Sequence, residues 1–199
     1  MEIKKIVITG GPCGGKTEAK KWIENVGTKM GYTVLFVPET ATELIPGGVC
    51  PWTCKTNMDY QIIQCELQLK KEELFLRAAT GMPKDKILIV CDRGFMDNRA
   101  YMNEEEYQTV LSVLNVSELD VLNSYDAIFH LVSAGKGLQE FYQLESNSAR
   151  IETADEAAIL DDKILECWAN HPNRKIINNA IDFQSKMQDL ANQIESFLN

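Results

Sequence analysis

A glycine-rich run near the N-terminus constrains the fold of this chain more than any other feature. The run reads Gly10-Gly11-Pro12-Cys13-Gly14-Gly15-Lys16-Thr17 and fits the pattern G-x-x-x-x-G-K-S/T. A short apolar segment at residues 3–9 precedes it, and a helix-like segment from residue 17 to about residue 30 follows it. Strand, glycine loop and helix in this order predict a phosphate-binding loop, because glycines let consecutive backbone N–H groups point at phosphate oxygens.

The residues of this phosphate loop (residues 10–17) have distinct expected roles. The helix that starts at its end adds a partial positive charge. Lys16 is expected to reach the β- and γ-phosphates of a nucleotide, and the Thr17 hydroxyl is expected to hold Mg²⁺. The remaining residues are expected to bind phosphate mainly through their backbone: Gly10, Gly11, Pro12, Cys13, Gly14 and Gly15.

Strands and helices alternate along the whole chain. Further strands are predicted at residues 33–37, 86–91, 127–132 and 175–177. Further helices are predicted from residue 56 or 57 to about 80, and at residues 104–114, 155–169 and 183–198. Alternation predicts an α/β fold with five parallel strands and helices on both faces. No repeat or linker interrupts the pattern, so one domain over residues 1–199 is expected.

Composition places the chain among ordinary globular proteins. Hydrophobic residues make up 45% and charged residues 25%, which excludes a disordered chain. No apolar run approaches the roughly 20 residues that a membrane helix needs. The 20 Lys and Arg residues against 29 Asp and Glu residues give a net charge of -9, which argues against nucleic acid or an anionic membrane as partner. The N-terminus lacks a signal-peptide core, so a cytoplasmic location is expected.

The third predicted strand ends in Cys91-Asp92-Arg93-Gly94. A carboxylate after an apolar strand can steady Mg²⁺ or its waters, which is the role expected for Asp92. The planar guanidinium of Arg93 is a candidate for clamping a phosphate or acceptor oxygen. The alternative is a surface ion pair between these two side chains. Asp97 and Arg99 either support the site or cap and solvate the next segment.

Glu39 follows the second predicted strand. Ligands of open α/β sheets lie beyond the carboxyl ends of the strands, which places Glu39 over the same crevice as Gly10 and Asp92. A carboxylate there is expected to take the proton from a hydroxyl that attacks the γ-phosphate. The alternative is an acid that opens a helix, and Glu43 is a weaker candidate one helical turn later.

A basic lid is expected at about residues 133–155. Phosphoryl transfer benefits from a cation that arrives late and neutralises the transferred group. Arg150 is the candidate for this cation and Lys136 the second choice, against the alternative of a solvated charged face. The loop that follows the last strand, with Asn178 and Asn179, is a weaker candidate for contact with an adenine ring.

The acceptor side has less specific signals. The loop at residues 47–56, which contains Trp52, is a candidate cover for an acceptor. The helix after it offers three amides that could read a base or a sugar, or that simply form an exposed polar face: Gln61, Gln64 and Gln68. Cys50 and Cys54 lie close together, but zinc needs two more ligands, so soft residues in a loop are the more economical interpretation.

These stretches together resemble the P-loop "AAA domain" family. The resemblance includes the ribosylnicotinamide kinase module of bacterial NAD-biosynthesis regulators and P-loop domains fused to CYTH-type triphosphatases. The matching stretches are residues 8–17, 37–42, 91–97, 100–102, 125–132, 144–150 and 176–183. The resemblance implies a nucleoside- or nucleotide-kinase-like three-layer sandwich with a five-stranded parallel sheet and a small helical lid. It also implies binding of ATP or GTP with Mg²⁺.

The function expected from the sequence is an ATP-dependent kinase for a small hydroxyl acceptor such as a nucleoside or nucleotide. Lys16, Glu39, Asp92, Arg93 and Arg150 would carry the reaction, and Thr17 and Asp92 would hold Mg²⁺. ATP is favoured over GTP because an Asn/Thr-Lys-x-Asp guanine signature is absent. The alternative is a nucleotide-binding regulator or switch that hydrolyses ATP or GTP slowly. A homodimer is compatible with either function.

Overall fold

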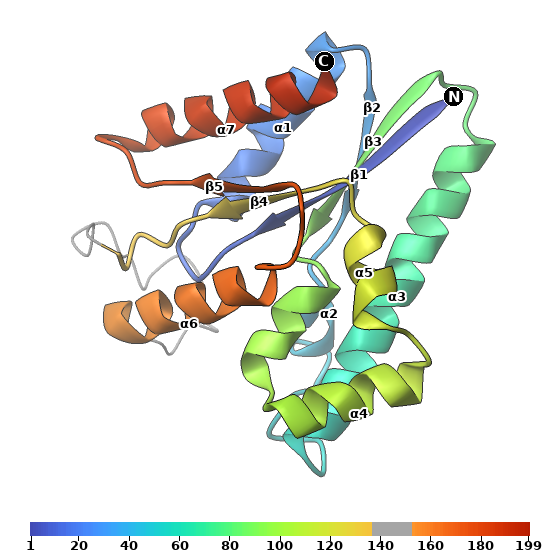
Figure 1. Ribbon diagram of the computed structural model, residues 1–199, viewed down its shortest axis with the longest axis vertical. Helices are drawn as coiled ribbons and strands as arrows, with labels where there is room; N and C mark the ends of the chain where they lie inside the picture. The colour runs from blue at the N-terminus through green and yellow to red at the C-terminus, as the bar shows by residue number, and fades with distance from the viewer. Residues whose placement is uncertain (137–152) are drawn as a thin grey trace.

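The computed structural model describes residues 1–136 and 153–199, and a five-stranded sheet forms its centre (Figure 1). The strands are β1 (Glu2–Thr9), β2 (Thr33–Val37), β3 (Lys86–Asp92), β4 (Ala127–Leu131) and β5 (Arg174–Ile177). Neighbouring strands are parallel, and their order across the sheet is β2-β3-β1-β4-β5. The predicted parallel sheet is therefore confirmed, and the carboxyl ends of its strands lie along one edge.

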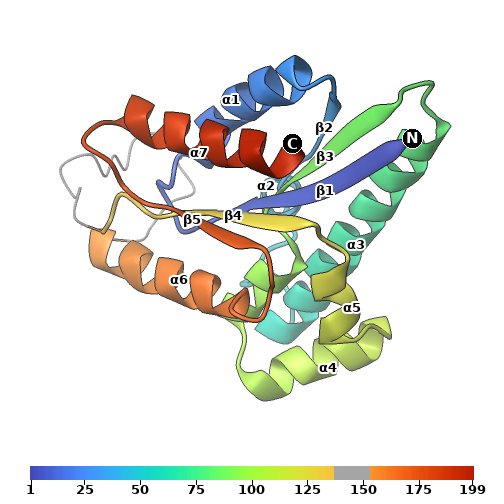
Figure 2. The same cartoon turned by 45° about the horizontal axis from the view of Figure 1, so that its top comes forward.

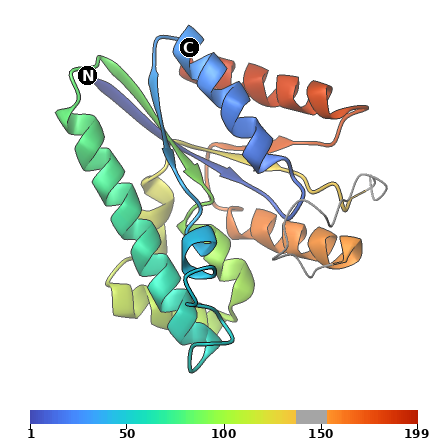
Figure 3. The same cartoon turned by 180° about the vertical axis from the view of Figure 1, so that it is seen from behind.

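The helices form a layer on each face of this sheet (Figures 1 and 2). On one face α1 (Lys16–Lys29) packs beside α7 (Phe183–Leu198). The other face carries α3 (Asn57–Gly81), α4 (Glu104–Leu114), α5 (Glu118–Asn123), α6 (Ala154–Cys167) and the 3-10 helix η1 (Phe95–Tyr101). The short α2 (Ala41–Leu44) lies beyond the end of β2, beside the middle of α3, where Glu43 pairs with Lys71 (Figure 3). This is the expected three-layer sandwich.

Alternate residues of the central strand supply the two cores. Ile6 and Ile8 of β1 pack with Ile23 of α1 and with Leu190 and Ile194 of α7. Val7 faces the other layer. Strand segments that are buried on both faces must be apolar, which explains the continuous apolar runs at residues 6–8 of β1 and 87–91 of β3.

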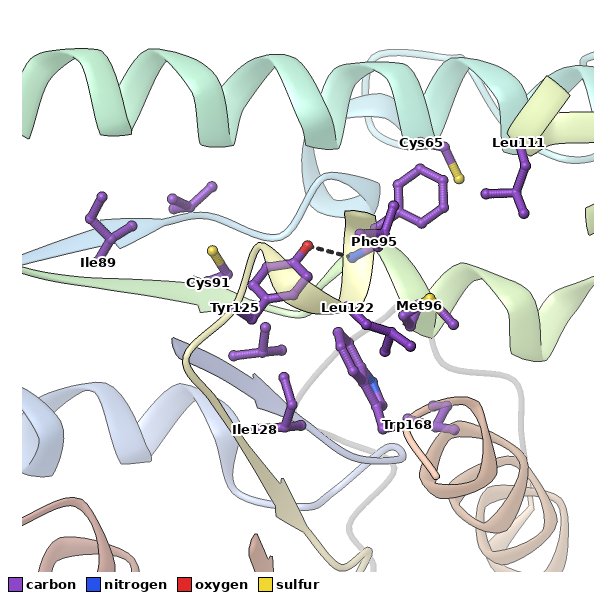
Figure 4. Packing of buried hydrophobic residues seen from close by; sticks show 14 of the residues in the cluster. Cys65, Ile89, Cys91, Phe95, Met96, Leu111, Leu122, Tyr125, Ile128 and Trp168 are labelled. Carbon is purple, nitrogen blue, oxygen red and sulfur yellow. Dashed lines mark hydrogen bonds between the residues drawn. The ribbon is translucent and has the colours of Figure 1, made fainter. Parts of the chain in front are cut away.

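The second core gathers around a fully buried tryptophan at the end of α6 (Figure 4). The ring of Trp168 meets that of Tyr125 edge to face, with 5.5 Å between the centroids. The Tyr125 hydroxyl accepts a hydrogen bond of 3.1 Å from the Phe95 N–H. These contacts join α6, η1 and the segment before β4, and so fix the backbone that follows β3.

Ten of the predicted elements are present with ends shifted by at most two residues, including α3, which begins with a capping box between Thr56 and Asp59. Three short elements, α2, η1 and α5, were not predicted. Residues 137–152 of the expected lid lie outside the described residues, and α6 already begins at Ala154. The domain count stays a prediction.

Asp97 is expected to be a major source of stability for the loop after β3. Its carboxylate accepts hydrogen bonds from the Thr9 hydroxyl, from Trp168 Nε1 at 2.8 Å and from the Gly94 N–H at 3.0 Å. Asp97→Asn places an amide N–H₂ group against one of these donors, so we expect a loss of about 1–3 kcal/mol in the free energy of unfolding. Urea unfolding measures the loss. The exposed Asp85→Asn, which changes the charge equally, should leave stability within about 0.5 kcal/mol of the parent, and equal behaviour of the two variants would contradict the prediction.

Candidate active site

The phosphate loop connects the end of β1 to the start of α1 by a tight backbone path. Gly10 and Gly15 adopt positive φ angles of 129° and 91°, and Cys13 lies in the left-handed region with φ 56°. A Cβ atom at Gly10 would lie 2.2 Å from the carbonyl oxygen of Leu131. Glycine is therefore required at Gly10 by both its φ angle and the close approach of β4.

Three successive carbonyls of the loop accept hydrogen bonds from the segment after β4 and from α7. Pro12 O accepts from the Ser133 hydroxyl, Cys13 O from the Ala134 N–H at 3.2 Å, and Gly14 O from Lys186 Nζ at 2.9 Å. In a trans peptide the C=O and the following N–H point in opposite directions. The N–H groups of Cys13, Gly14 and Gly15 are therefore directed away from β4, and successive N–H groups arranged in this way can form an anion-binding concavity.

Lys16 begins α1 with its ammonium group folded back over the loop. Its Nζ donates to Gly10 O at 2.9 Å and to Gly11 O at 2.8 Å. Loss of hydration and the charge of Arg93, opposed by the charge of Glu39, lower the pKa of Lys16 to about 8. The cation thus lies against the loop, and its contact with the β- and γ-phosphates stays a prediction.

Glu39 and Arg93 form an ion pair over the same edge of the sheet. Arg93 Nε donates to Glu39 Oε1 at 2.5 Å, and its Nη1 donates to Gly10 O at 3.3 Å. Burial alone would raise the pKa of Glu39, but the charges of Arg93 and Lys16 outweigh it and hold the pKa below its ordinary value. Arg93 has a positive φ of 67°, a conformation that is uncommon for a side chain of this size and recurs at functional sites.

The two residues expected to hold Mg²⁺ stand on neighbouring elements. Thr17 lies in the first turn of α1, and Asp92 ends β3 directly beside Ile8 of β1. Asp92 Oδ2 forms an ion pair of 2.9 Å with Lys20. A hydroxyl and a carboxylate are oxygen donors of the kind that Mg²⁺ prefers, so the donor set fits the ion.

The polar face of α3 is buried, which corrects the expectation of an exposed glutamine face. Gln68 is fully engaged: its Oε1 accepts from the Thr40 hydroxyl, while its Nε2 donates to Glu72 and to Arg93 O. Gln64 donates to Asn98 and accepts from the Tyr60 hydroxyl. Gln68 thus ties the loops that carry Glu39 and Arg93 to one helix, and neither amide is available to read a base.

Gln61 differs from its two neighbours on α3. Its side chain is 3% exposed, and Oε1 has no hydrogen-bond partner among the described residues. An unpartnered buried carbonyl is costly unless a ligand or water satisfies it. Nearby, burial and the charge of Glu39 raise the pKa of Tyr60 to about 12. Gln61 is therefore the candidate from this helix that remains for an acceptor.

The expected lid cations have different outcomes. Arg150 lies outside the described residues. Lys136 pairs with Asp161 at 2.8 Å and with Asp162 at 2.6 Å. Arg99, for which the sequence left open support of the site or solvation of the next segment, pairs with Glu104 and Glu118.

Three residues that anchor the phosphate loop, directly or through a neighbour, carry no signal in the sequence. Asp161 of α6 accepts from the Gly11 N–H at 2.6 Å and pairs with the buried His130 of β4 at 3.0 Å. Lys186 of α7 contacts Gly14, as described above. All three were predicted only as parts of a strand or helix, because isolated acids and bases show no motif.

The cysteines and the other side chains that could bind a metal form no further metal site in the part of the chain that the structure describes. The six cysteines are free of disulfides. The Cys50 thiol donates to Ile45 O at 3.4 Å, and no group of three or more His, Cys, Asp or Glu side chains in residues 1–136 and 153–199 is arranged to hold a metal ion. The loop interpretation of Cys50 and Cys54 is favoured.

The family model described as "AAA domain" matches residues 5–186, which is most of the chain. The chain belongs to the AAA domain family. This match covers every residue of the site just described, from Gly10 to Lys186, and it confirms the resemblance drawn from the motifs. No curated protein sequence matches this AAA domain.

A solved structure shows the same fold. The deoxyadenosine kinase from M. mycoides, determined with bound dATP, superposes with a TM-score of 0.62 over 96% of this chain and 98% of that chain, at 15% sequence identity. The likeness confirms the nucleoside-kinase-like fold of the AAA domain. Within the described residues, no helix combines the length and apolarity that crossing a membrane would need.

Proposed function

We propose that this AAA domain is a phosphotransferase that moves the γ-phosphate of MgATP to the hydroxyl of a small, nucleoside-like acceptor. The single observation that carries the proposal is the Glu39–Arg93 pair, whose Arg93 also contacts Gly10 of the phosphate loop. A protein that only binds nucleotide needs no carboxylate beside the loop and beyond the end of β2. Glu39 stands where an acceptor hydroxyl would meet the last phosphate.

The proposed reaction uses few groups. The acceptor oxygen bonds to the γ-phosphorus, the bond to the bridging oxygen of ADP breaks, and the hydroxyl proton passes to Glu39. Bound Mg²⁺, held by Thr17 and Asp92, would neutralise phosphate charge. Lys16 and Arg93 stabilise the charge on the transferring group, and the amides of the phosphate loop fix its position. Arg150 stays a candidate for a further cation.

A nucleoside-like acceptor is supported by the surroundings of the Glu39–Arg93 pair. α3 lies along this side of the site, with Tyr60 and Gln61 in its first turns. A buried amide whose oxygen lacks a donor suits the N–H groups of a base or the hydroxyls of a sugar. The fold shared with a deoxyadenosine kinase supports the same class of acceptor.

The test of the proposed function is transfer of label from γ-labelled MgATP to a pooled panel of nucleosides, nucleotides and ribosylnicotinamide. Label on an organic compound establishes the kinase and identifies its acceptor. Slow release of labelled phosphate in every mixture would instead support the switch. A parallel series with MgGTP distinguishes the donors.

Gln61→Met should weaken acceptor use without weakening the fold. Loss of the amide removes about one good buried hydrogen bond, so we expect KM for the acceptor to rise about 10- to 100-fold while KM for ATP stays unchanged. Because Gln61 Oε1 has no partner among the described residues, the melting temperature should stay equal or rise. The exposed Gln108→Met on α4 is the matched control. A lower melting temperature with unchanged KM values would show a purely structural role.

A further inference from the structure

A second lysine lies against the phosphate loop, on the side opposite to the phosphate-binding concavity. Lys186, in α7, is 5% exposed. Its Nζ donates to Gly14 O at 2.9 Å, to Val132 O at 2.6 Å and to Asn179 Oδ1 at 3.1 Å. The ammonium group therefore joins the loop to the end of β4 and to the segment after β5.

Every one of these partners is a neutral oxygen. No ion pair with Lys186 occurs in the described residues, and the charge that acts on it from a distance is that of Asp161 in α6, which is itself engaged by His130 and Lys136. Lysine is rarely buried without a paired acid, and its place in the N-terminal part of α7 is also disfavoured by the helix dipole. Burial of this cation therefore lowers the stability of the free protein, and this cost calls for a compensating interaction in another state.

The free-energy cost of burying the Lys186 charge depends on pH. Loss of hydration lowers the pKa of Lys186 from its ordinary 10.5 to about 8, although Asp161 favours the charged form. The folded state therefore prefers the neutral amine more than the unfolded state does. The cost of burying the charge is fully present below about pH 8 and is relieved as the pH rises toward 10.5.

The contact between Lys186 and Gly14 indicates a role for the ammonium group. The Lys186 ammonium binds the carbonyl side of the Gly14–Gly15 peptide, and the N–H of Gly15 leaves the peptide on the opposite side. A charged donor on a carbonyl polarises the peptide and strengthens its N–H as a donor. Gly15 has a φ of 91°, so its backbone orientation depends on such contacts.

We propose that Lys186 is a positioning residue that directs and polarises the Gly15 N–H toward a bound polyphosphate, whose negative charge compensates the buried cation. The inference rests on the proposed function only in requiring that the phosphate loop bind a polyphosphate. It does not require transfer to an acceptor. Gly14, Val132 and Asn179 hold the ammonium group in place.

Binding of inorganic tripolyphosphate and of MgATP, measured by titration calorimetry in wild type and Lys186→Met, tests the proposal. We expect the variant to bind both about 10-fold more weakly, or worse, at pH 7. At about pH 8.5 the wild type should take up about half a proton more on binding than the variant does, because the anion restores the proton on Lys186. Buffers of different ionisation enthalpy give the proton number.

The matched control is Lys29→Met, which removes an exposed lysine that pairs with Glu195 of α7. It should bind tripolyphosphate like the wild type. If Lys186→Met does not fold, Lys186→Gln keeps a neutral donor and should show the same loss of proton uptake. Wild-type affinity with unchanged proton uptake in the Lys186 variants overturns the proposal, as does failure of tripolyphosphate to bind the wild type. Normal binding effects without transfer to any acceptor would reject the kinase and leave this inference standing.

Discussion

Lys16→Ala is expected to lose phosphoryl transfer by about 10³-fold or more. The Lys16 ammonium group bonds to the carbonyls of Gly10 and Gly11, whereas the neighbouring cation, Arg93, is paired with Glu39. The fold should persist, because burial of the Lys16 ammonium group costs hydration free energy and the group makes no ion pair in the part of the chain that the structure describes. Transfer of label from γ-labelled ATP measures the loss.

The control for Lys16→Ala is Lys21→Ala, an exposed lysine of the same helix. It should keep full activity, and both variants should melt within a few degrees of the wild type. Turnover by Lys16→Ala within about tenfold of the wild type would refute the assignment of the loop as the centre of phosphate chemistry.

Glu39→Gln is expected to reduce transfer by about 10²-fold or more while leaving the Kd for ATP nearly unchanged. The amide still accepts a hydrogen bond from Arg93, but it cannot take the hydroxyl proton. Because Arg93 and Lys16 keep the pKa of Glu39 below 4.5, the carboxylate is ionised at neutral pH. The wild-type rate should therefore show no loss attributable to this group until the pH falls below about 4.5.

Glu43→Gln is the matched control for this prediction. Glu43 also follows β2 and also pairs with a cation, Lys71, but it is half exposed and belongs to α2. Transfer by Glu43→Gln should stay within a few-fold of the wild type. Similar losses in both variants would mean that Glu39 acts through the stability of this region and takes no proton.

The elements whose boundaries the sequence predicts well are those with local signals. Thr56 and Asp59 form the capping box that starts α3, and the phosphate loop lies between a strand and a helix as its spacing requires. The short helices α2, η1 and α5 were missed, because four to seven residues carry too little periodicity to distinguish a helical turn from a loop.

The contacts that hold the site together join residues far apart in the chain. Gly11 meets Asp161 across 150 positions, Gly14 meets Lys186 across 172, and Glu39 meets Arg93 across 54. Of these, the sequence placed only Glu39 and Arg93 at a common edge, because both follow parallel strands. A single acid or lysine within a helix has no local signature of what it will contact.

The polar stripe of α3 shows a second limit. Side chains repeating every three or four residues define one face of a helix, but the period is the same whether that face meets water or a polar interior. Gln64 and Gln68 meet an interior, where their partners come from η1 and from the loops after β2 and β3. Composition alone favours the exposed alternative, which is wrong here.

The 25 residues of α3 span about 37 Å, several turns more than the sheet beside it requires. Gln68 anchors the helix at the level where β3 ends, so the turns of α3 that precede Gln68 extend beyond the edge of the sheet. Under the proposed function, substitutions on these turns would alter the acceptor side of the site and leave the phosphate loop and the Glu39–Arg93 ion pair in place.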